Sequence, residues 1–383
     1  MQVGIPKETS QNDRRIAAVP ETVSKMVKSG MQVAVEAGAG AGALISDKEF
    51  QEAGAKIASS AQALFSESDI LLKVNKPSIE EIDRMKEGAV LIAFLQPLAS
   101  PDIIKRLAQR KVSALSMELI PRITRAQRMD ALSTMSTVAG YKAVLLAANA
   151  CGRFLPMLST AAGTIPPAKV IVIGAGVAGL QAIATAKRLG GVVTAFDTRP
   201  AAGEQVKSVG AEFVSLEVPH DQAEDAGGYA KELPPEFYQK EQELIRKHSK
   251  DADIIITTAL VPGKRAPALI TEEMVKEMKP GSVIVDLAVE QGGNCTLSEP
   301  GKEVVKHGVT IIGILNIPSM MPMHASLLYA RNIHAFLNLI SPDGKSVKLD
   351  PADEIIKASL ITHHGEIVHP GVKEAVGKGG AIQ

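Results

Sequence analysis

The sequence has few of the residues that mark several large classes of protein. It contains two cysteines, Cys151 and Cys295, with no CxxC pair or Cys/His cluster around them, which argues against a disulfide framework or a structural zinc site. Tryptophan is absent, and four tyrosines and eight phenylalanines offer few stacking surfaces for single-stranded nucleic acid. The 42 basic residues equal the 42 acidic ones, so no net charge attracts a polyanion. We therefore expect two buried thiols, no metal and no nucleic-acid partner.

Signals for secretion or membrane insertion are also missing. The opening MQVGIPKETS has no basic stretch followed by an apolar one, so we expect no secretory signal and an intracellular protein. A bilayer span needs roughly 20 apolar residues, whereas the Val/Ile runs at 170–173 and 284–289 have the length of strands. We therefore expect that the chain does not cross a membrane by itself.

Short Val/Ile-rich runs alternate with segments of helical period along the whole chain, which is the pattern of parallel βαβ units. A length of 383 residues fits about two domains. The predicted fold class is α/β, with two doubly wound Rossmann-like domains joined by long crossing helices. In the first third of the chain we expect helices such as 21–29 and 102–110, and strands near 3–5, 33–36, 70–74, 90–95 and 114–117.

Two apolar helical segments predict where the chain passes between the domains. The Ala-rich stretch 136–158, broken near Pro156, leads into the second domain, and the segment 323–339 has the length to return. We predict a first domain of residues 1–135 plus 320–383 and a second domain of residues 136–319. The Gly-rich tail GVKEAVGKGGAIQ is expected to be frayed or a linker. Strands of the second sheet are expected at 169–173, 192–196, 212–215, 253–259, 282–287 and 310–313.

The second domain carries a dinucleotide fingerprint. The stretch KVIVIGAGVAGLQAIATAKRLGGVVTAFD places Gly174, Gly176 and Gly179 in a GxGxxG pattern, directly after a strand and at the start of a helix. The first glycine permits a tight turn, the second lets the backbone approach a pyrophosphate, and the third lets the helix lie close to the sheet. The N–H groups of the first helical turn, at Val177 and Ala178, then face the phosphates.

An acidic residue at the end of the next strand indicates which dinucleotide binds. Asp197 lies about 20 residues past the turn, where a carboxylate accepts hydrogen bonds from the adenosine ribose and repels a 2′-phosphate. We therefore predict NAD(H) as the cofactor, with Thr198 and Arg199 also in contact with it. Arg199 weighs against this choice, because an arginine in this loop could receive a phosphate. The alternative for Asp197 is a purely structural turn cap.

Two stretches of the chain resemble a known pair of related families. The run TTALVPGKRAPALITEEMVKEMKPGSVIVDLAVEQGGN, residues 257–294, and PKETSQNDRRIAAVPETV near the N-terminus are similar to alanine dehydrogenases and to the NAD(H)-binding domain of proton-translocating transhydrogenases. The resemblance covers nearly the whole chain. It implies backbone contacts with the nucleotide from Thr258, Ala259 and Leu260, which follow a strand at the carboxyl edge of the sheet.

A polar loop in the first domain favours the transhydrogenase relative. PRITRAQRMDALS, residues 121–133, resembles that family's nicotinamide-contacting loop. The match implies that Gln127 and Asp130 pair with the carboxamide, that Arg122 supplies a positive charge beside the ring or phosphates, and that Ser133 completes the set. The alternative is an ordinary polar helix start, and the neighbouring arginines, 125 and 128, are expected to be solvated.

A second segment favours the same relative. DAGGYAKELPPEFYQKEQ, residues 225–242, resembles the family's mobile loop that closes over bound nucleotide, with Gly228 in the hinge and Tyr229 at the matching position. From the residues alone, the same segment is an ordinary flexible insertion.

The residues that an amino-acid dehydrogenase requires are only partly present. Arg15 and Lys73 match the alanine dehydrogenase substrate-binding pair. The position of that family's catalytic histidine is Gln96, which cannot exchange a proton near neutral pH, and the acid before QGG is Glu290 in place of the expected aspartate. We therefore expect that the amino-acid chemistry has been lost and that Arg15 and Lys73 remain as structural ion-pair partners.

The resemblance implies a complete reaction and its partners. Direct, reversible hydride transfer from NADH to NADP+, of the Re/Si-specific transhydrogenase type, needs no proton at either ring carbon. It needs only close positioning in a water-poor site, which agrees with a missing general base. Only one dinucleotide fingerprint is present, so NADP(H) is expected on a partner subunit, beside membrane-spanning subunits that move protons.

The resemblance also implies a homodimer at the cytoplasmic face of the inner membrane, with an organelle matrix as the alternative compartment. The alternative functions are an alanine-dehydrogenase-like enzyme and a non-catalytic NADH-responsive module. The histidines at 363, 364 and 369 lack acidic partners at ligand spacing, so we expect no metal there.

Overall fold

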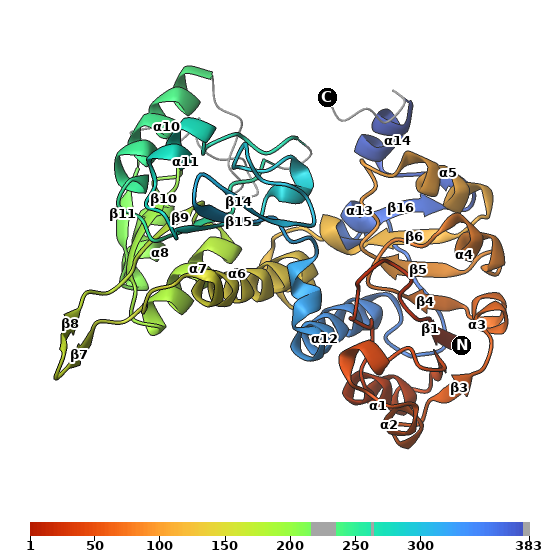
Figure 1. Cartoon of the computed structure of the whole chain (residues 1–383). Coiled ribbons are helices and arrows are strands. Elements are labelled where there is room, and N and C mark those ends of the chain that lie inside the picture. Colours follow the sequence, from red (N-terminus) through yellow and green to blue (C-terminus); the bar gives the residue numbers. More distant parts are fainter. Residues whose placement is uncertain (216–234, 262–263, 378–383) are drawn as a thin grey trace. The chain divides into compact units, whose positions relative to one another are not determined.

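The computed structural model describes residues 1–215, 235–261 and 264–377, and these form two compact units. Unit 1 comprises Met1–Met135 and the described residues from Pro318 onward, and unit 2 comprises Ser136–Ile317. Figure 1 labels the helices and strands of both units. The predicted α/β class with two doubly wound units is confirmed, whereas the crossing of long helices between domains stays a prediction.

Unit 1 is built on an eight-stranded sheet among the described residues, in the order β17-β16-β6-β5-β4-β1-β2-β3. The strands from β3 to β6 are parallel, and β16 joins β6 in the antiparallel sense. The strands are β1 (Gln2–Ile5), β2 (Gln32–Glu36), β3 (Lys56–Ala58), β4 (Ile70–Leu72), β5 (Val90–Ala93), β6 (Ser113–Ser116), β16 (Leu360–His363) and β17 (Glu366–Ile367).

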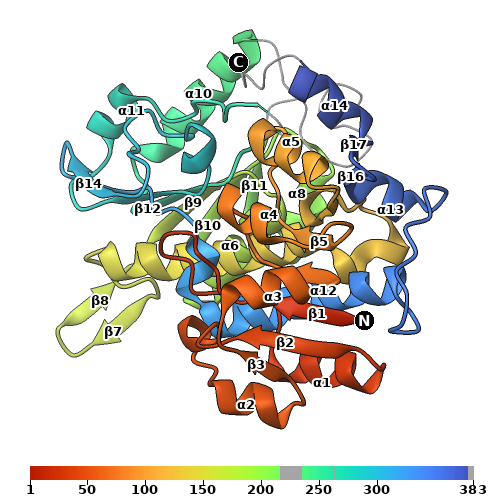
Figure 2. The same ribbon diagram turned by 90° about the vertical axis from the view of Figure 1, so that its right-hand side faces the viewer.

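Helices cover both faces of this sheet. Apolar residues of α3, α4, α5 and α14 form one core with the strands, and Figure 2 shows α3, α4 and α5 together on that side. Helices α1 and α12 contact each other elsewhere in unit 1. The helices are α1 (Pro20–Lys28), α2 (Asp47–Glu52), α3 (Ala61–Glu67), α4 (Ile79–Arg84), α5 (Pro101–Gln109), α12 (Pro322–Ile340), α13 (Glu354–Ser359) and α14 (Pro370–Gly377), with the 3-10 turns η1 (Ala41–Ala43), η2 (Met117–Leu119), η3 (Thr124–Met129) and η5 (Ile317–Met320).

Unit 2 has a seven-stranded sheet among the described residues, in the order β11-β10-β9-β12-β13-β15-β14, with only β14 antiparallel to its neighbour. The first five strands of the two sheets, taken along the chain, have the same order. A separate hairpin of β7 and β8 extends away from this sheet (Figure 1). The strands are β7 (Leu158–Thr160), β8 (Gly163–Ile165), β9 (Lys169–Ile173), β10 (Val192–Phe196), β11 (Glu212–Val214), β12 (Ile254–Thr257), β13 (Val283–Asp286), β14 (Glu303–Lys306) and β15 (Val309–Ile312). The helices are α6 (Ala131–Ala150), α7 (Val177–Arg188), α8 (Ala202–Ser208), α10 (Pro235–Ser249) and α11 (Glu272–Glu277), with the 3-10 turn η4 (Val289–Gln291).

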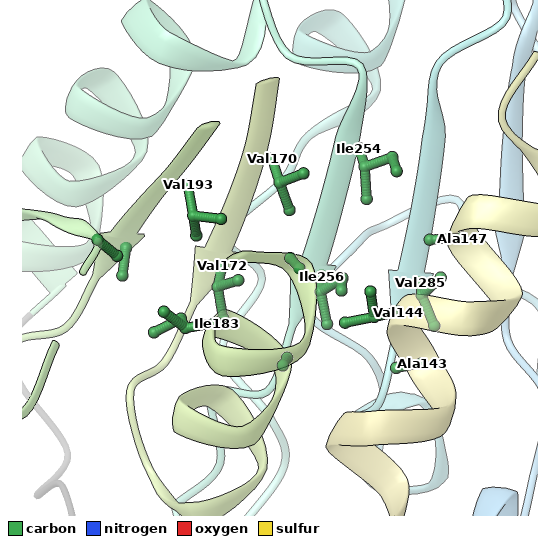
Figure 3. Close-up of a cluster of buried hydrophobic side chains, with 14 of the residues drawn as sticks. Ala143, Val144, Ala147, Val170, Val172, Ile183, Val193, Ile254, Ile256 and Val285 are labelled. Atoms are coloured by element: carbon green, nitrogen blue, oxygen red, sulfur yellow. The ribbon is translucent and has the colours of Figure 1, made fainter. Parts of the chain in front are cut away.

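The packing of unit 2 explains why its central strands are unbroken runs of apolar residues in the sequence. Both faces of a doubly wound parallel sheet are covered, so side chains on either side of each strand are buried. On one face, β-branched side chains of β9, β10, β12 and β13 meet small residues of α6 and Ile183 of α7 (Figure 3). The opposite face packs against apolar residues of α10 and α11. Cys151 and Cys295 are buried and free, as predicted.

The structure corrects two predictions, one about a long helix and one about the C-terminal tail. The predicted helix over residues 136–158 is α6, which begins five residues earlier at Ala131 and ends at Ala150, before the hairpin. The start shifts because Asp130 caps the helix, and the end falls just before Gly152, a poor helix former. The tail expected to be frayed contains α14, which packs Val372 and Val376 on the core of unit 1.

Helix α6 also corrects the expectation about apolar segments. By length and composition it could cross a membrane, although 39% of its most apolar window is buried inside the protein. Its apolar residues are mostly alanine, leucine and valine, interspersed with polar ones, so it contains no Val/Ile run like those of the strands. A core helix meets the same criterion, and α6 contributes Ala143, Val144 and Ala147 to the core of unit 2.

Candidate functional site

The glycine-rich turn in unit 2 joins β9 to α7 in a conformation that requires glycine. Gly174 has a φ of +92°, in the left-handed region that side chains disfavour. Its N–H donates to the carbonyl oxygen of Phe196 at 2.8 Å, and its carbonyl oxygen accepts from the Thr258 hydroxyl at 2.9 Å. A Cβ on Gly174 would lie 2.6 Å from that hydroxyl. The turn is therefore fixed between the carboxyl ends of β10 and β12.

Two further glycines allow helices to approach this turn. A Cβ on Gly179 would lie 1.8 Å from the carbonyl oxygen of Gly174, and one on Gly140 of α6 would lie 2.1 Å from the carbonyl oxygen of Ala178. Both distances are far below any real contact, so each position requires glycine. Gly140 was not predicted, because a glycine in an Ala-rich helix gives no sequence signal of what it touches.

Gly176 is different, because the space at this glycine is open. A Cβ added there would meet no atom of the described residues within 4 Å, and Gly176 caps α7 without a side-chain hydrogen bond. The first N–H groups of α7, at Val177 and Ala178, lie at the positive end of a 12-residue helix. Open space beside uncapped N–H groups fits the pyrophosphate of a dinucleotide.

Asp197 lies directly after β10, and both of its carboxylate oxygens are engaged. One accepts the backbone N–H of Ala175 at 2.7 Å, and the other accepts the backbone N–H of Arg199 at 2.8 Å. The Arg199 side chain donates to both oxygens, at 2.9 and 2.8 Å. Asp197 therefore acts as a turn cap and an ion-pair partner in this state, and Thr198 lies half-buried between the pair.

The segment after β12 is held by a residue that the sequence reasoning missed. Asn294 is buried, accepts the Ala259 N–H at 3.0 Å and donates to the Ala259 carbonyl oxygen at 2.9 Å. The Thr258 N–H donates to the Ile173 carbonyl oxygen at 2.7 Å. Nucleotide contacts expected from the backbone of Thr258 and Ala259 would compete with these bonds, whereas Leu260 lies at the half-buried end of the segment.

The polar loop 121–133 belongs to unit 1 up to the first turn of α6. Asp130 caps that helix, since its carboxylate accepts the Ser133 N–H at 2.8 Å. The side chains of Arg122 and Gln127 are exposed on or beside η3. Asn332 of α12 anchors the loop by donating to the Arg128 carbonyl oxygen at 2.9 Å.

Arg125, in the same loop, was expected to be solvated. It pairs through two hydrogen bonds, of 2.7 and 3.0 Å, with Asp353, the cap of α13. The loop is therefore joined to α13 as well as to α12, and sequence spacing gave no sign of either connection.

Arg15 and Lys73 are buried in a cluster of charges in unit 1. The Arg15 side chain pairs with Asp13, whose pKa is held well below its ordinary value by hydrogen bonds and by the charge of Arg15 despite partial burial. Lys73 lies 3.0 Å from Glu81 and 3.8 Å from Glu8. The predicted ion-pair role of Arg15 and Lys73 is confirmed.

Glu8 ties this cluster to the backbone. Its carboxylate accepts the N–H groups of Val74 at 2.6 Å and Asn75 at 3.2 Å. Burial raises the pKa of Glu8, although Lys73 opposes the rise. The Lys73 carbonyl oxygen accepts the hydroxyl of the fully buried Tyr329 at 2.7 Å. The sequence did not predict these partners, because they come from four separate segments.

Gln96, at the position of the missing histidine, lies in a strained turn with a φ of +48°. Its backbone N–H donates to the half-buried Glu118 carboxylate, and its side chain accepts from Lys76 at 3.1 Å. Burial raises the pKa of Glu118. In unit 2, Glu290 accepts the Asn316 N–H at 2.6 Å. Gln96 itself cannot act as a general acid or base.

The site residues predicted from sequence thus fall into two sets. Gly174–Gly179, Asp197–Arg199 and Thr258–Leu260 gather at one sheet edge of unit 2, and the loop 121–133 belongs to unit 1. Gly228 and Tyr229 lie outside the described residues. Within 1–215, 235–261 and 264–377, no group of three His, Cys, Asp or Glu side chains could hold a metal.

Comparison with known proteins assigns the chain to a family. Residues 4–139 match the N-terminal domain and residues 143–370 the C-terminal domain of the alanine dehydrogenase/PNT family. The chain is 51% identical to an NAD(P) transhydrogenase subunit alpha of Rhodospirillum rubrum, over 97% of this chain and 99% of that protein.

Solved structures agree with this assignment. A transhydrogenase from Sinorhizobium meliloti is 45% identical, with a TM-score of 0.85 over 97% of this chain and 100% of that one. An L-alanine dehydrogenase is 26% identical, with a TM-score of 0.84 over the whole of both chains. The chain therefore belongs to the alanine dehydrogenase/PNT family, and its sequence lies nearer to the transhydrogenases than to the alanine dehydrogenases.

Proposed function

We propose that this chain is the NAD(H)-binding subunit of a proton-translocating NAD(P)+ transhydrogenase and passes hydride directly between NADH and NADP+ held by a partner subunit. The chain is 51% identical to a transhydrogenase alpha subunit over 97% of its own length and 99% of that protein, which supports this function. Unit 2 supplies the cofactor site, because its open glycine turn and uncapped helix N-terminus fit a pyrophosphate.

The observation that carries the choice against alanine dehydrogenase is the charge cluster of unit 1. Arg15 and Lys73, which would hold an amino-acid carboxylate, are instead neutralised by Asp13, Glu81 and Glu8. Removing either cation from these pairs would leave buried carboxylates uncompensated. With Gln96 in place of a proton-exchanging group, amine oxidation has neither its binding site nor its acid/base.

The residues of the loop 121–133 have positioning roles in this proposal. When bound, the reduced nicotinamide supplies the hydride, and the chain holds and orients it. Gln127 and Asp130 would hydrogen-bond the carboxamide, Arg122 would place a positive charge beside the phosphates or ring, and Ser133 would support Asp130. Tyr229 and Gly228 would belong to the segment that excludes water.

The partners follow from the same reaction. NADP(H) would be held by a second subunit, and proton movement would take place in membrane-spanning subunits. The chain would be a homodimer, peripheral at the cytoplasmic face of the membrane. Hydride transfer of the Re/Si-specific type needs only that both rings meet in a water-poor site, so no further group from this chain is required.

A reconstitution experiment tests the proposal. The purified chain and NADH are mixed with an NADP-binding transhydrogenase subunit loaded with a spectrally distinct NADP+ analogue, and reduction of the analogue is followed by absorbance. Rapid reduction that depends on this chain is the expected result. Oxidation of NADH by the isolated chain with ammonia and pyruvate would instead establish the dehydrogenase. NADH binding without any transfer, despite docking of the partner, would establish a sensor.

A further inference from the structure

Helix α10 lies against the end of strand β10, next to the residue that marks the ribose end of the dinucleotide site. Ile245 of α10 is fully buried in one cluster with Phe196, the last residue of β10. The ring of His248 stands edge-on to that of Phe196, with 5.3 Å between centroids and 77° between planes. Asp197 follows Phe196 directly, so this face of α10 is beside Asp197.

Glu241 occupies the same face of α10, one turn before Ile245. It is 8% exposed, and its carboxyl group forms no hydrogen bond or ion pair with any residue that the structure describes. Burial disfavours the charged form of a carboxyl group, because little water remains to solvate it.

The charges around Glu241 include a second carboxylate, because Ile245, one turn further along α10, packs with Phe196, the residue directly before Asp197. Burial raises the pKa of Glu241 to about 7, and the charge of Asp197 adds to the rise. The other charged groups on the surrounding elements are Arg199 after β10, His248 on α10 itself, Arg246 paired with Glu277 of α11, and Lys264 and Arg265 in the loop that lines a small cavity with Tyr238.

Asp197 alone does not give this region a negative charge. Its carboxylate is paired with the Arg199 guanidinium at 2.8 Å, and the pair is neutral. Arg199 is moreover the type of residue that binds a 2′-phosphate in NADP-dependent sites. A further acidic group near Asp197 would therefore strengthen the rejection of NADP(H), and Glu241 is buried on the face of α10 that packs against the end of β10.

We propose that Glu241 is a specificity-determining residue of the dinucleotide site, which excludes NADP(H) by placing a second carboxylate beside Asp197 where a 2′-phosphate would bind. The inference rests on the proposed binding of NAD(H) in unit 2. Exclusion by a repulsive group is a common way to separate two otherwise identical ligands. Because the exclusion needs the ionised carboxylate, it strengthens as the pH rises through neutrality.

The test compares the affinities of the full-length chain for NADH and NADPH, measured by the fluorescence of each nucleotide at pH 6 and pH 8.5. Glu241→Gln removes the charge and keeps the shape, and Glu243→Gln changes an exposed residue of the same helix as the matched control. At pH 8.5 we expect Glu241→Gln to tighten NADPH binding about 10-fold and to change NADH binding less than about 3-fold.

The pH series separates Glu241 from the phosphate itself, which titrates near pH 6. The preference of the wild type for NADH should rise further between pH 6 and 8.5 than that of Glu241→Gln. Unchanged NADPH affinity at pH 8.5 in a Glu241→Gln protein that binds NADH normally would overturn the inference. Failure of the wild type and Glu243→Gln to bind NADH would overturn the proposed function instead. If Glu241→Gln does not fold, Glu241→Asp, which keeps the charge, must retain the exclusion.

Discussion

The sheets of the two units share the order of their first five strands but differ at the turn after their first strand. In unit 2, β9 leads into Gly174, whose carbonyl oxygen is bonded by Thr258 at the end of β12. In unit 1, β1 leads to Glu8, whose carboxylate is bonded by the N–H groups that follow β4. Both turns lie where the strand order reverses, which is the place where open α/β sheets bind ligands.

The turns after β9 and β1 differ in their charge and in the space that their side chains leave open. The unit 2 turn has open space at Gly176 beside helix N–H groups, which favours an anion. The unit 1 turn is filled by a buried carboxylate and its partner Lys73, which repels an anion. The same frame thus carries the proposed nucleotide site in one unit and a structural charge cluster in the other, and side chains rather than topology decide which.

The largest effect is expected in the unit 1 cluster. Lys73→Met should leave Glu81 and Glu8 without their buried cation and lower the free energy of unfolding by about 3 to 5 kcal/mol. Denaturant unfolding measures this loss, with Lys48→Met as the control, because Lys48 is 82% exposed in its pair. NADH affinity should stay within about 2-fold of the wild type if folded protein is compared. A large loss of NADH affinity would contradict the separation of this charge cluster from the nucleotide site.

The next largest effect is expected on NADH affinity, from a substitution in unit 2 that should leave stability unchanged. Gly176→Ala adds a Cβ into open space, so stability should hardly change, whereas NADH affinity should fall about 10- to 100-fold because the pyrophosphate can no longer approach the backbone. Calorimetry of binding and thermal unfolding give the two values. Gly152→Ala, which also meets no neighbour, is the control. An unchanged NADH affinity for Gly176→Ala would show that the turn is not a phosphate site.

Glu241 gives unit 2 a stability that depends on pH. In the native protein its pKa is raised to about 7 from an ordinary value of 4.5, so the native state binds the extra proton between these values. Stability from this group therefore falls as the pH rises from 4.5 to 7. Glu241→Gln should be more stable than the wild type by about 3 kcal/mol at pH 8 and nearly equal at pH 4.5. A difference that is the same at both pH values would refute this titration.

The smallest effect on stability concerns the loop of unit 1. Asp130→Ala removes the cap of α6 and should cost about 1 kcal/mol, whereas Asp130→Asn keeps the cap. If Asp130 also positions the nicotinamide, Asp130→Asn should slow hydride transfer more than it weakens NADH binding. Stopped-flow transfer with the NADP-binding partner, beside NADH titration, measures both. Equal small effects would leave Asp130 as a cap and nothing more.

The features that the sequence predicts correctly depend on residues close to one another in the chain. The glycine turn, Asp197 and the central strands of both sheets depend on spacing and on apolar runs, and the structure has the expected strands at those places. The short or mainly polar strands β3, β14 and β17 were missed, because pairing with neighbours rather than composition makes them strands.

The missed site features all depend on contacts between distant segments. Asn294 reaches Ala259 across 35 residues, Glu8 reaches Val74 across 66, and Gly140 touches α7 from another helix. Glu241 lies in a helix of mostly polar residues, where nothing in the sequence separates a buried carboxylate from the exposed ones. Only the fold shows that it is buried beside Asp197.

The central claim is that two sheets with the same central strand order carry a nucleotide site in unit 2 and a buried charge cluster in unit 1. Hydrogen exchange of the full chain, measured with and without NADH, tests this claim. The account predicts slower exchange on NADH binding at the amides of residues 174–180, where the turn begins α7, and no change at residues 6–9 after β1. Protection at residues 6–9 without protection at 174–180 would contradict it, because the nucleotide would then occupy the turn that Glu8 fills.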